Sequence, residues 1–149
     1  MRVEWIIIAE GFGTSSNGAV TAIGINQRVV IAPSLPTTTK RGVIAHFSSD
    51  NRVEVDREFE VSLNVADPAG HPIVAMTSPA KFSPIQKWPG VPEGIDIFLE
   101  IPLRLTTPGE YRVSLSLTPP GEERVTGQVP LYVIQGPVPP VDSTATHQE

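Results

Sequence analysis

The sequence contains no cysteine among its 149 residues. A disulfide framework, a thiol nucleophile and any cysteine-ligated zinc or iron–sulfur site are therefore excluded. The absence of cysteine is compatible with a reducing cytoplasm. A chain of this length buries a core without such crosslinks, so we expect a single domain.

Long apolar runs are also missing. The N-terminal run Trp5–Ala9 holds five residues before Glu10 interrupts it. A secretory signal needs about 7–15 apolar residues behind a basic start, and a membrane-spanning helix needs about 20. We therefore expect a soluble cytoplasmic protein that is not exported and does not contact a membrane.

Positive charge is scarce, because eleven Lys and Arg face sixteen Asp and Glu and give a net charge of −5. A nucleic-acid partner would require a basic surface, so none is expected. Sixteen prolines and twelve glycines disfavour helix interiors and supply turns. No stretch of about twelve residues shows the helical period, which indicates an all-β chain.

Alternation of apolar and polar residues predicts the strands. They are expected at Arg2–Ala9, Ala19–Ala32 (split at Gly24), Gly42–Ser48, Glu58–Ala66, His71–Met76, Ile95–Leu105, from Tyr111 and at Arg124–Ile134. The Pro108-Gly109 turn before Tyr111 is typical of the tyrosine corner of immunoglobulin-like sandwiches. We predict an immunoglobulin-like antiparallel β-sandwich of seven to nine strands over 1–134, followed by a Pro-rich disordered tail over 135–149.

Turn signals refine this prediction. Asp67-Pro68-Ala69-Gly70 indicates a hairpin between the strands on either side of it. Asn17-Gly18 also favours a hairpin over a phosphate-binding loop, because neither Lys-Ser/Thr nor a helix follows it. Pro102 lacks an N–H and therefore favours an edge strand or a bulge.

Three segments are apolar on both faces: Trp5–Ile8, Val29–Ile31 and Val43–Ala45. A sandwich strand hides only one face, so something must cover the other. The two candidates are the long connection Thr77–Gly94 and a partner molecule, because large exposed apolar patches are rare on monomers.

No residue pattern predicts catalysis. The histidines are His46, His71 and His147, and their spacing does not place two of them on one metal ion. No Gly-x-Ser-x-Gly motif is present. The alternating carboxylates Glu54, Asp56, Glu58 and Glu60 favour a solvated strand face over a cation site or a docking surface. We predict no enzyme activity, no metal and no cofactor.

The best binding candidate is the segment Lys81–Gly90, which lies in the long connection. It offers Phe82, Lys87 and Trp88, an aromatic and cationic set of the kind that anchors protein partners. The alternative is that Phe82 and Trp88 only cap the sandwich. Pro137–Pro140 also matches a polyproline ligand, a pattern that arises by chance in Pro-rich tails.

Several short features recur together: Ala9-Glu10 after the first strand, Asn17-Gly18 before Ile23-Gly24, Pro36 before the Val43 strand, Asp67–Gly70, Gly109-Glu110-Tyr111 and Val129–Val133. In this set the chain resembles a family of small bacterial β-sandwich proteins classed as a domain of unknown function. The resemblance implies a sandwich over nearly the whole chain up to Val133, and it supplies no activity and no functional residue.

From the sequence we expect a non-enzymatic binding or accessory module that engages a protein partner or itself. The surfaces would be the Thr77–Gly94 connection and the two-faced N-terminal strands. Two alternatives stay open. One is a small-ligand or hydrolytic site in which His46, Asp50 or His71 converge, and the other is a structural component of an assembly.

Overall fold

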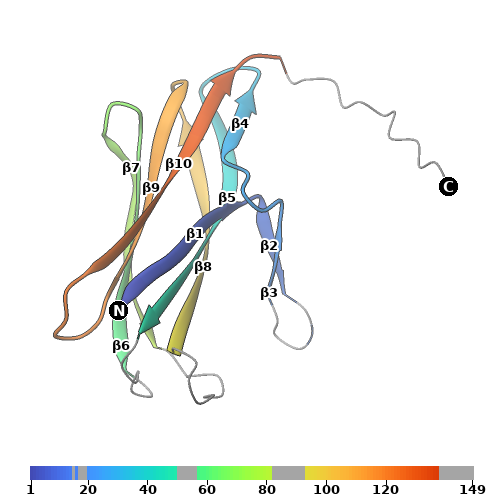
Figure 1. Ribbon diagram of the computed structural model, residues 1–149. Helices are drawn as coiled ribbons and strands as arrows, with labels where there is room; N and C mark the ends of the chain where they lie inside the picture. The colour runs from blue at the N-terminus through green and yellow to red at the C-terminus, as the bar shows by residue number, and fades with distance from the viewer. Residues whose placement is uncertain (15, 17–19, 50–56, 82–92, 138–149) are drawn as a thin grey trace.

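The computed structural model describes residues 1–14, 16, 20–49, 57–81 and 93–137, and these residues form strands and no helix (Figure 1). None of them belongs to a helix long and apolar enough to cross a membrane. The strands are β1 (Arg2–Ala9), β2 (Gly11–Thr14), β3 (Val20–Ile23), β4 (Val29–Ala32), β5 (Thr37–Ser49), β6 (Glu58–Ala66), β7 (Pro72–Lys81), β8 (Glu93–Leu105), β9 (Gly109–Thr118) and β10 (Val125–Gln135).

Eight of these strands form two sheets that face each other. One sheet has three strands in the order β1-β5-β8, and the other has five in the order β4-β10-β9-β6-β7. Pairing is antiparallel except between β4 and β10, which run parallel. The remaining two strands, β2 and β3, form a separate hairpin beside the sandwich (Figure 1). The predicted all-β sandwich is therefore confirmed.

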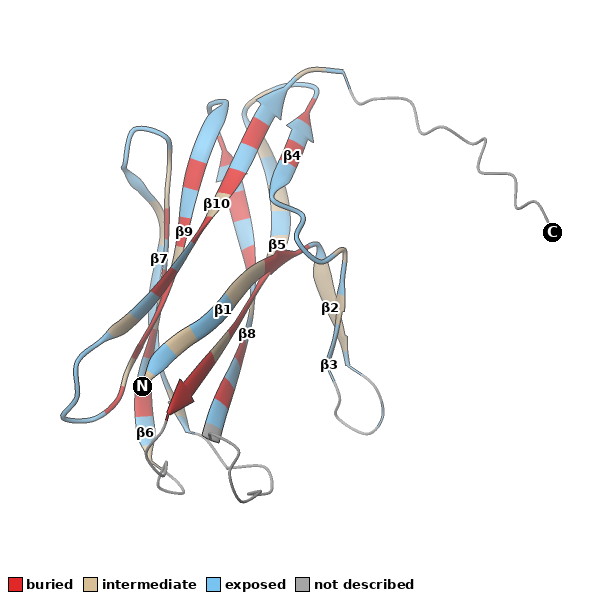
Figure 2. Cartoon of the chain, in the orientation of Figure 1, coloured by how far each residue is buried: buried red, intermediate tan, exposed pale blue. Residues whose placement is uncertain are grey.

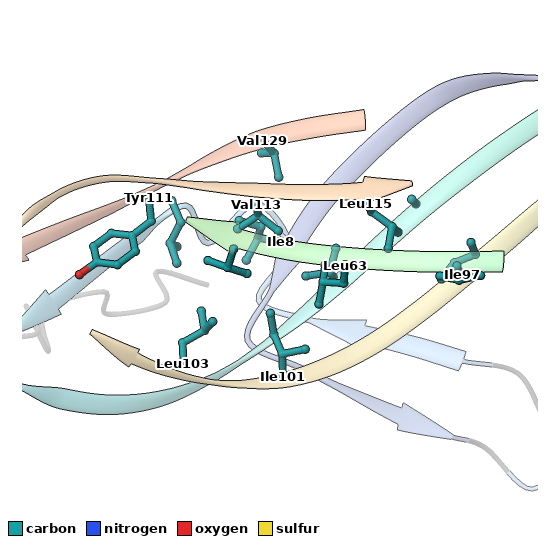
Figure 3. Packing of buried hydrophobic residues seen from close by; sticks show 14 of the residues in the cluster. Ile8, Leu63, Ile97, Ile101, Leu103, Tyr111, Val113, Leu115 and Val129 are labelled. Carbon is teal, nitrogen blue, oxygen red and sulfur yellow. The ribbon is translucent and has the colours of Figure 1, made fainter. Parts of the chain in front are cut away.

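The core fills the space between the sheets. Every second residue of β6 from Phe59 to Val65 and of β9 from Tyr111 to Leu117 is buried, and in β8 the same alternation holds except at Leu99, which is partly buried. The alternation appears as stripes along β8 and β9 in Figure 2. Figure 3 shows Leu63 and Leu115 from the five-stranded sheet and Ile101 and Leu103 from β8 lying between the two sheets. Because apolar area removed from water is the main stabilising term, this layer holds the fold together.

Tyr111 anchors the turn before β9. Its side chain is fully buried, and its hydroxyl donates to the carbonyl oxygen of Thr107 at 3.0 Å. The same oxygen accepts from the backbone N–H groups of Thr106 and Thr107, each at 3.2 Å. The phenol therefore ties the β8–β9 connection to the sheet, as the Pro-Gly-Glu-Tyr pattern predicts.

The bounds of β1 and β6 match the prediction. Two strands are longer than predicted because their partners are long. Thr37–Arg41 pairs with Leu105–Ile101 of β8, so β5 begins five residues before Gly42. Ser78–Lys81 pairs with Val61–Glu58, so β7 takes up the start of the expected Thr77–Gly94 connection.

The N-terminal hairpin contains a strand that was not among those predicted. Gly11–Thr14 forms β2, which pairs antiparallel with β3. The hairpin predicted from Asn17-Gly18 is therefore present, although those two residues lie outside the described ones. The predicted bend at Gly24 is confirmed, since its φ of +63° ends β3 and separates it from β4.

Two further predictions concern Pro102 and the start of the C-terminal tail. Pro102 lies in β8, an edge strand of the three-stranded sheet, as expected for a residue without an N–H. Strand β10 continues to Gln135, one residue into the predicted tail. The backbone N–H of Gly136 still donates to Ala32, and residues 138–149 of the predicted tail lie outside the described ones.

Candidate functional site

The candidate site is the outer face of the three-stranded sheet, meaning the side turned away from the five-stranded sheet. Strand pairing aligns Trp5, His46 and Asp96 in one row across β1, β5 and β8. The next row holds Ile7, Ile44 and Phe98. This surface therefore combines aromatic, imidazole and carboxylate groups from strands far apart in the sequence.

A bulge in β1 shapes this face. Val3 pairs with Phe47 and Trp5 pairs with His46, so Glu4 is an extra residue between them. Bulges redirect side chains and are common beside functional sites. The Glu4 carboxylate accepts hydrogen bonds from the Ser48 hydroxyl and, at 2.6 Å, from Arg2 Nε. The Ser48 bond, followed by the Arg2 bond, lowers the pKa of Glu4 below its ordinary value, so Glu4 is a stable anion.

His46 is held from several sides. Its Nδ1 lies 2.7 Å from Asp96 Oδ1, and its ring stacks on Trp5 with centroids 5.6 Å apart and planes 17° apart. A side chain at Gly94 would collide with the imidazole, so the glycine leaves the space that the ring occupies. The orientation of His46 is therefore fixed by a hydrogen bond, a stacked ring and a close backbone.

The neighbouring row is covered in part by β2. Phe12 packs edge-on against Phe98, with centroids 5.8 Å apart and planes at 88°. A Cβ on Gly42 would lie only 2.5 Å from the Phe12 ring, so Phe12 lies directly over this glycine. The sequence predicted a cover from the Thr77–Gly94 connection or from a partner. Residues 82–92 of that connection lie outside the described ones, and among the described residues the β2–β3 hairpin supplies part of the cover. In the sequence, the feature that could have indicated this cover is Phe12, an apolar residue between two glycines shortly after β1.

This cover is incomplete. Ile44 is only 3% exposed, but Trp5 and Phe98 keep 43% and 40% of their surface open to solvent. A second apolar area lies on the five-stranded sheet, where parallel pairing aligns Val29 with Tyr132 and Ile31 with Ile134, all of them exposed. The expected second apolar faces are therefore partly open in the described part of the chain.

The described residues of the outer face contain part of an acid–base arrangement. Asp96 holds the imidazole of His46, and such a pair is one part of catalytic acid–base sites. In those sites a hydroxyl nucleophile bonds the imidazole, whereas here the Ser48 hydroxyl donates to Glu4. Among the described residues no three potential ligands group around a metal position. His71 bonds Asp67 in the turn before β7, on the other sheet, so His46 and His71 do not converge.

The predicted binding residues Phe82, Lys87 and Trp88 lie outside the described residues, as do Asp50, Glu54, Asp56 and His147. Of the carboxylate series, Glu58 and Glu60 are exposed on β6, and Glu60 lies 3.2 Å from Arg124. The connection that carries Phe82, Lys87 and Trp88 enters β8 at Glu93, close in sequence to Asp96 and Phe98 of the outer face.

No protein-family model matches the chain, and no curated protein matches its sequence. Function is therefore inferred from the surface itself.

Proposed function

We propose that the protein is a non-enzymatic binding module that holds a protein partner on the outer face of its three-stranded sheet. The observation that carries this proposal is the pair of half-exposed aromatic side chains, Trp5 and Phe98, beside the fixed ring of His46. Aromatic residues are enriched at the centres of protein interfaces, where a few of them supply most of the binding energy.

Charge defines the partner further. Glu4, Asp96 and Glu100 border the two aromatics, and the whole chain carries a net charge of −5. A complementary surface would present apolar side chains to Trp5 and Phe98 and Lys or Arg to the carboxylates. A guanidinium could also lie over the indole ring of Trp5. The partner is therefore expected to be a basic protein surface.

The site is preorganised for binding. Stacking between Trp5 and His46 and the bond from His46 to Asp96 restrict three side chains before any partner arrives. Binding then costs less side-chain entropy than it would with mobile residues, which cost about 0.5–1.5 kcal/mol each.

Other parts of the proposal rest on the sequence. Phe82, Lys87 and Trp88 would extend the same surface, because their connection leads into β8. The buried Tyr111 and its bonds to Thr107 support an immunoglobulin-like type of sandwich. A cytoplasmic location fits a chain without cysteine. Membership in the family of small bacterial sandwich proteins stays a prediction.

The test compares partner capture by three forms of the full chain. One is the wild type, one carries Trp5→Ala with Phe98→Ala, and the control carries Tyr132→Ala on the other sheet, where the ring is equally exposed at 42%. Proteins retained by the wild type and the control but lost from the double variant support the proposal. Equal retention by all three forms, with unchanged melting temperatures, would overturn it.

A second candidate function, a structural subunit of a homo-oligomer, is favoured by the apolar area of Val29, Ile31, Tyr132 and Ile134. Light scattering across a concentration series tests it. A monomeric mass at every concentration would contradict this candidate and leave the first one untouched.

A further inference from the structure

The two sides of the sandwich are closed differently. On one side β1 packs against β10, so closely that a Cβ on Gly127 would lie 2.9 Å from Val3. On the other side β7 and β8 are both edge strands, and they are not paired to each other. A cavity of about 210 Å³ opens between them, with mainly apolar walls from Val61, Leu63, Met76, Ala80, Ile97 and Leu99. We call this cavity the β7–β8 slot.

The slot exists because the two sheets differ in width. Five strands face three, and the inward-facing residues of β7 lack a strand opposite them in the described part of the chain. Met76 pairs with the buried Leu63 and points to the same side, yet it is 42% exposed. An apolar inner face without cover is unusual, since burial of such surface drives folding.

We propose that the β7–β8 slot binds an extended strand from a partner protein, which pairs with the edge of β8 that no described strand occupies. The slot adjoins the outer face, because Asp96 and Phe98 line both, but this proposal does not depend on the function proposed for that face. An unpaired edge offers a row of backbone N–H and C=O groups that an extended peptide can satisfy. In β8 the residues Gly94–Ile101 precede Pro102, so every one of them keeps its N–H.

The walls of the slot define the sequence of the strand. Side chains at alternate positions would point inward to Val61, Met76 and Ile97, and these must be apolar. The positions between them would lie on the outer side, beside Asp96 and Glu100 of β8. Opposite charges across paired strands stabilise the pair. The partner strand is therefore expected to alternate apolar residues with Lys, Arg or Thr.

A single bound strand would add a fourth strand to the narrow sheet and cover the inner face of β7.

The experiment uses the full chain with ¹³C-labelled methionine methyl groups and a synthetic peptide of about ten residues that alternates Val with Lys and Thr. The chain has two methionines, so Met76 reports on the slot and Met1 serves as the internal reference. We expect the peptide to shift the Met76 signal and to slow amide hydrogen exchange in β8. A peptide with proline at its centre should do neither. No change of Met76 or β8 with the Val-Lys-Thr peptide would overturn the proposal.

Two variants of β7 locate the binding. Ser78→Arg places a bulky cation at the slot, and Ala75→Arg places it on the opposite face of the same strand. We expect Ser78→Arg to weaken peptide binding by about tenfold or more, and Ala75→Arg to leave it unchanged. Binding that survives Ser78→Arg contradicts the slot. Trp5→Ala should leave peptide binding intact, because Trp5 does not line the slot, and this result distinguishes the slot proposal from the outer-face proposal.

Discussion

Tyr111→Phe removes one oxygen atom from the fold and leaves the aromatic ring in place. In the wild type this oxygen makes three backbone contacts, accepting from the N–H groups of Thr106 and Thr107 and donating to the Thr107 carbonyl. The ring itself is fully buried in the core cluster. The variant therefore isolates the hydrogen bonds of the β8–β9 connection from its apolar packing.

The magnitude follows from those bonds. A buried polar group that loses its partner costs about 1–3 kcal/mol, and the connection is only partly buried, so water recovers part of the loss. We expect the free energy of unfolding to fall by about 2 kcal/mol. At roughly 2–4 °C per kcal/mol for a chain of this size, the melting temperature should fall by about 4–8 °C.

The assay is urea unfolding followed by circular dichroism, with calorimetry for the melting temperature. The second tyrosine of the chain provides the control, because Tyr132 is exposed on β10 and Tyr132→Phe should change stability by less than about 0.5 kcal/mol. Equal stability of Tyr111→Phe and the wild type would refute the reasoning. It would mean that the connection is held by its turn alone.

Three further predictions concern other contacts. Leu63→Ala, in the centre of β6, should lower the free energy of unfolding in urea by about 2–5 kcal/mol, and a smaller loss would contradict tight packing around this side chain. Gly42→Ala should displace the Phe12 ring and cost about 1–3 kcal/mol, with altered ring signals in NMR spectra; unchanged signals would contradict the contact. The pKa of Asp67 is lowered, mainly because its carboxylate accepts a hydrogen bond from the backbone N–H of His71. The ionised carboxylate therefore stabilises the fold above the unfolded pKa of about 3.9, and this stabilisation is lost as the pH falls through the lower pKa of the folded state. The advantage of the wild type over Asp67→Asn in thermal melts should therefore shrink below about pH 4, and an advantage that does not change with pH would contradict it.

Most of the sandwich could be predicted because its strands carry the period-2 pattern. β6 alternates Phe59, Val61, Leu63 and Val65 with polar residues, and its bounds match the prediction. The pattern does not predict the first part of β5, because Thr37–Arg41 has no apolar face and becomes a strand only through pairing with β8. Tertiary pairing overrides local propensity at such positions.

The candidate site could not be assembled from the sequence. His46 and Asp96 are 50 positions apart, and their contact depends on the register between β5 and β8. Trp5 lies in the same row only because Glu4 forms a bulge in β1, and no residue pattern around Glu4 predicts that bulge. The sequence did identify Trp5 as part of an apolar surface in need of a cover, and it missed Phe12, which lies in a segment for which no strand was predicted.

The most direct test of the proposed outer-face interface is site-specific photo-crosslinking in cells. A photoreactive benzoylphenylalanine is placed at position 98, and a control chain carries it at position 132, since Phe98 and Tyr132 are equally exposed on opposite sheets. We predict a discrete crosslinked species from position 98 that is absent from position 132 and disappears when Trp5→Ala is added. No crosslink at position 98, or the same species from both positions, would contradict a partner-binding outer face.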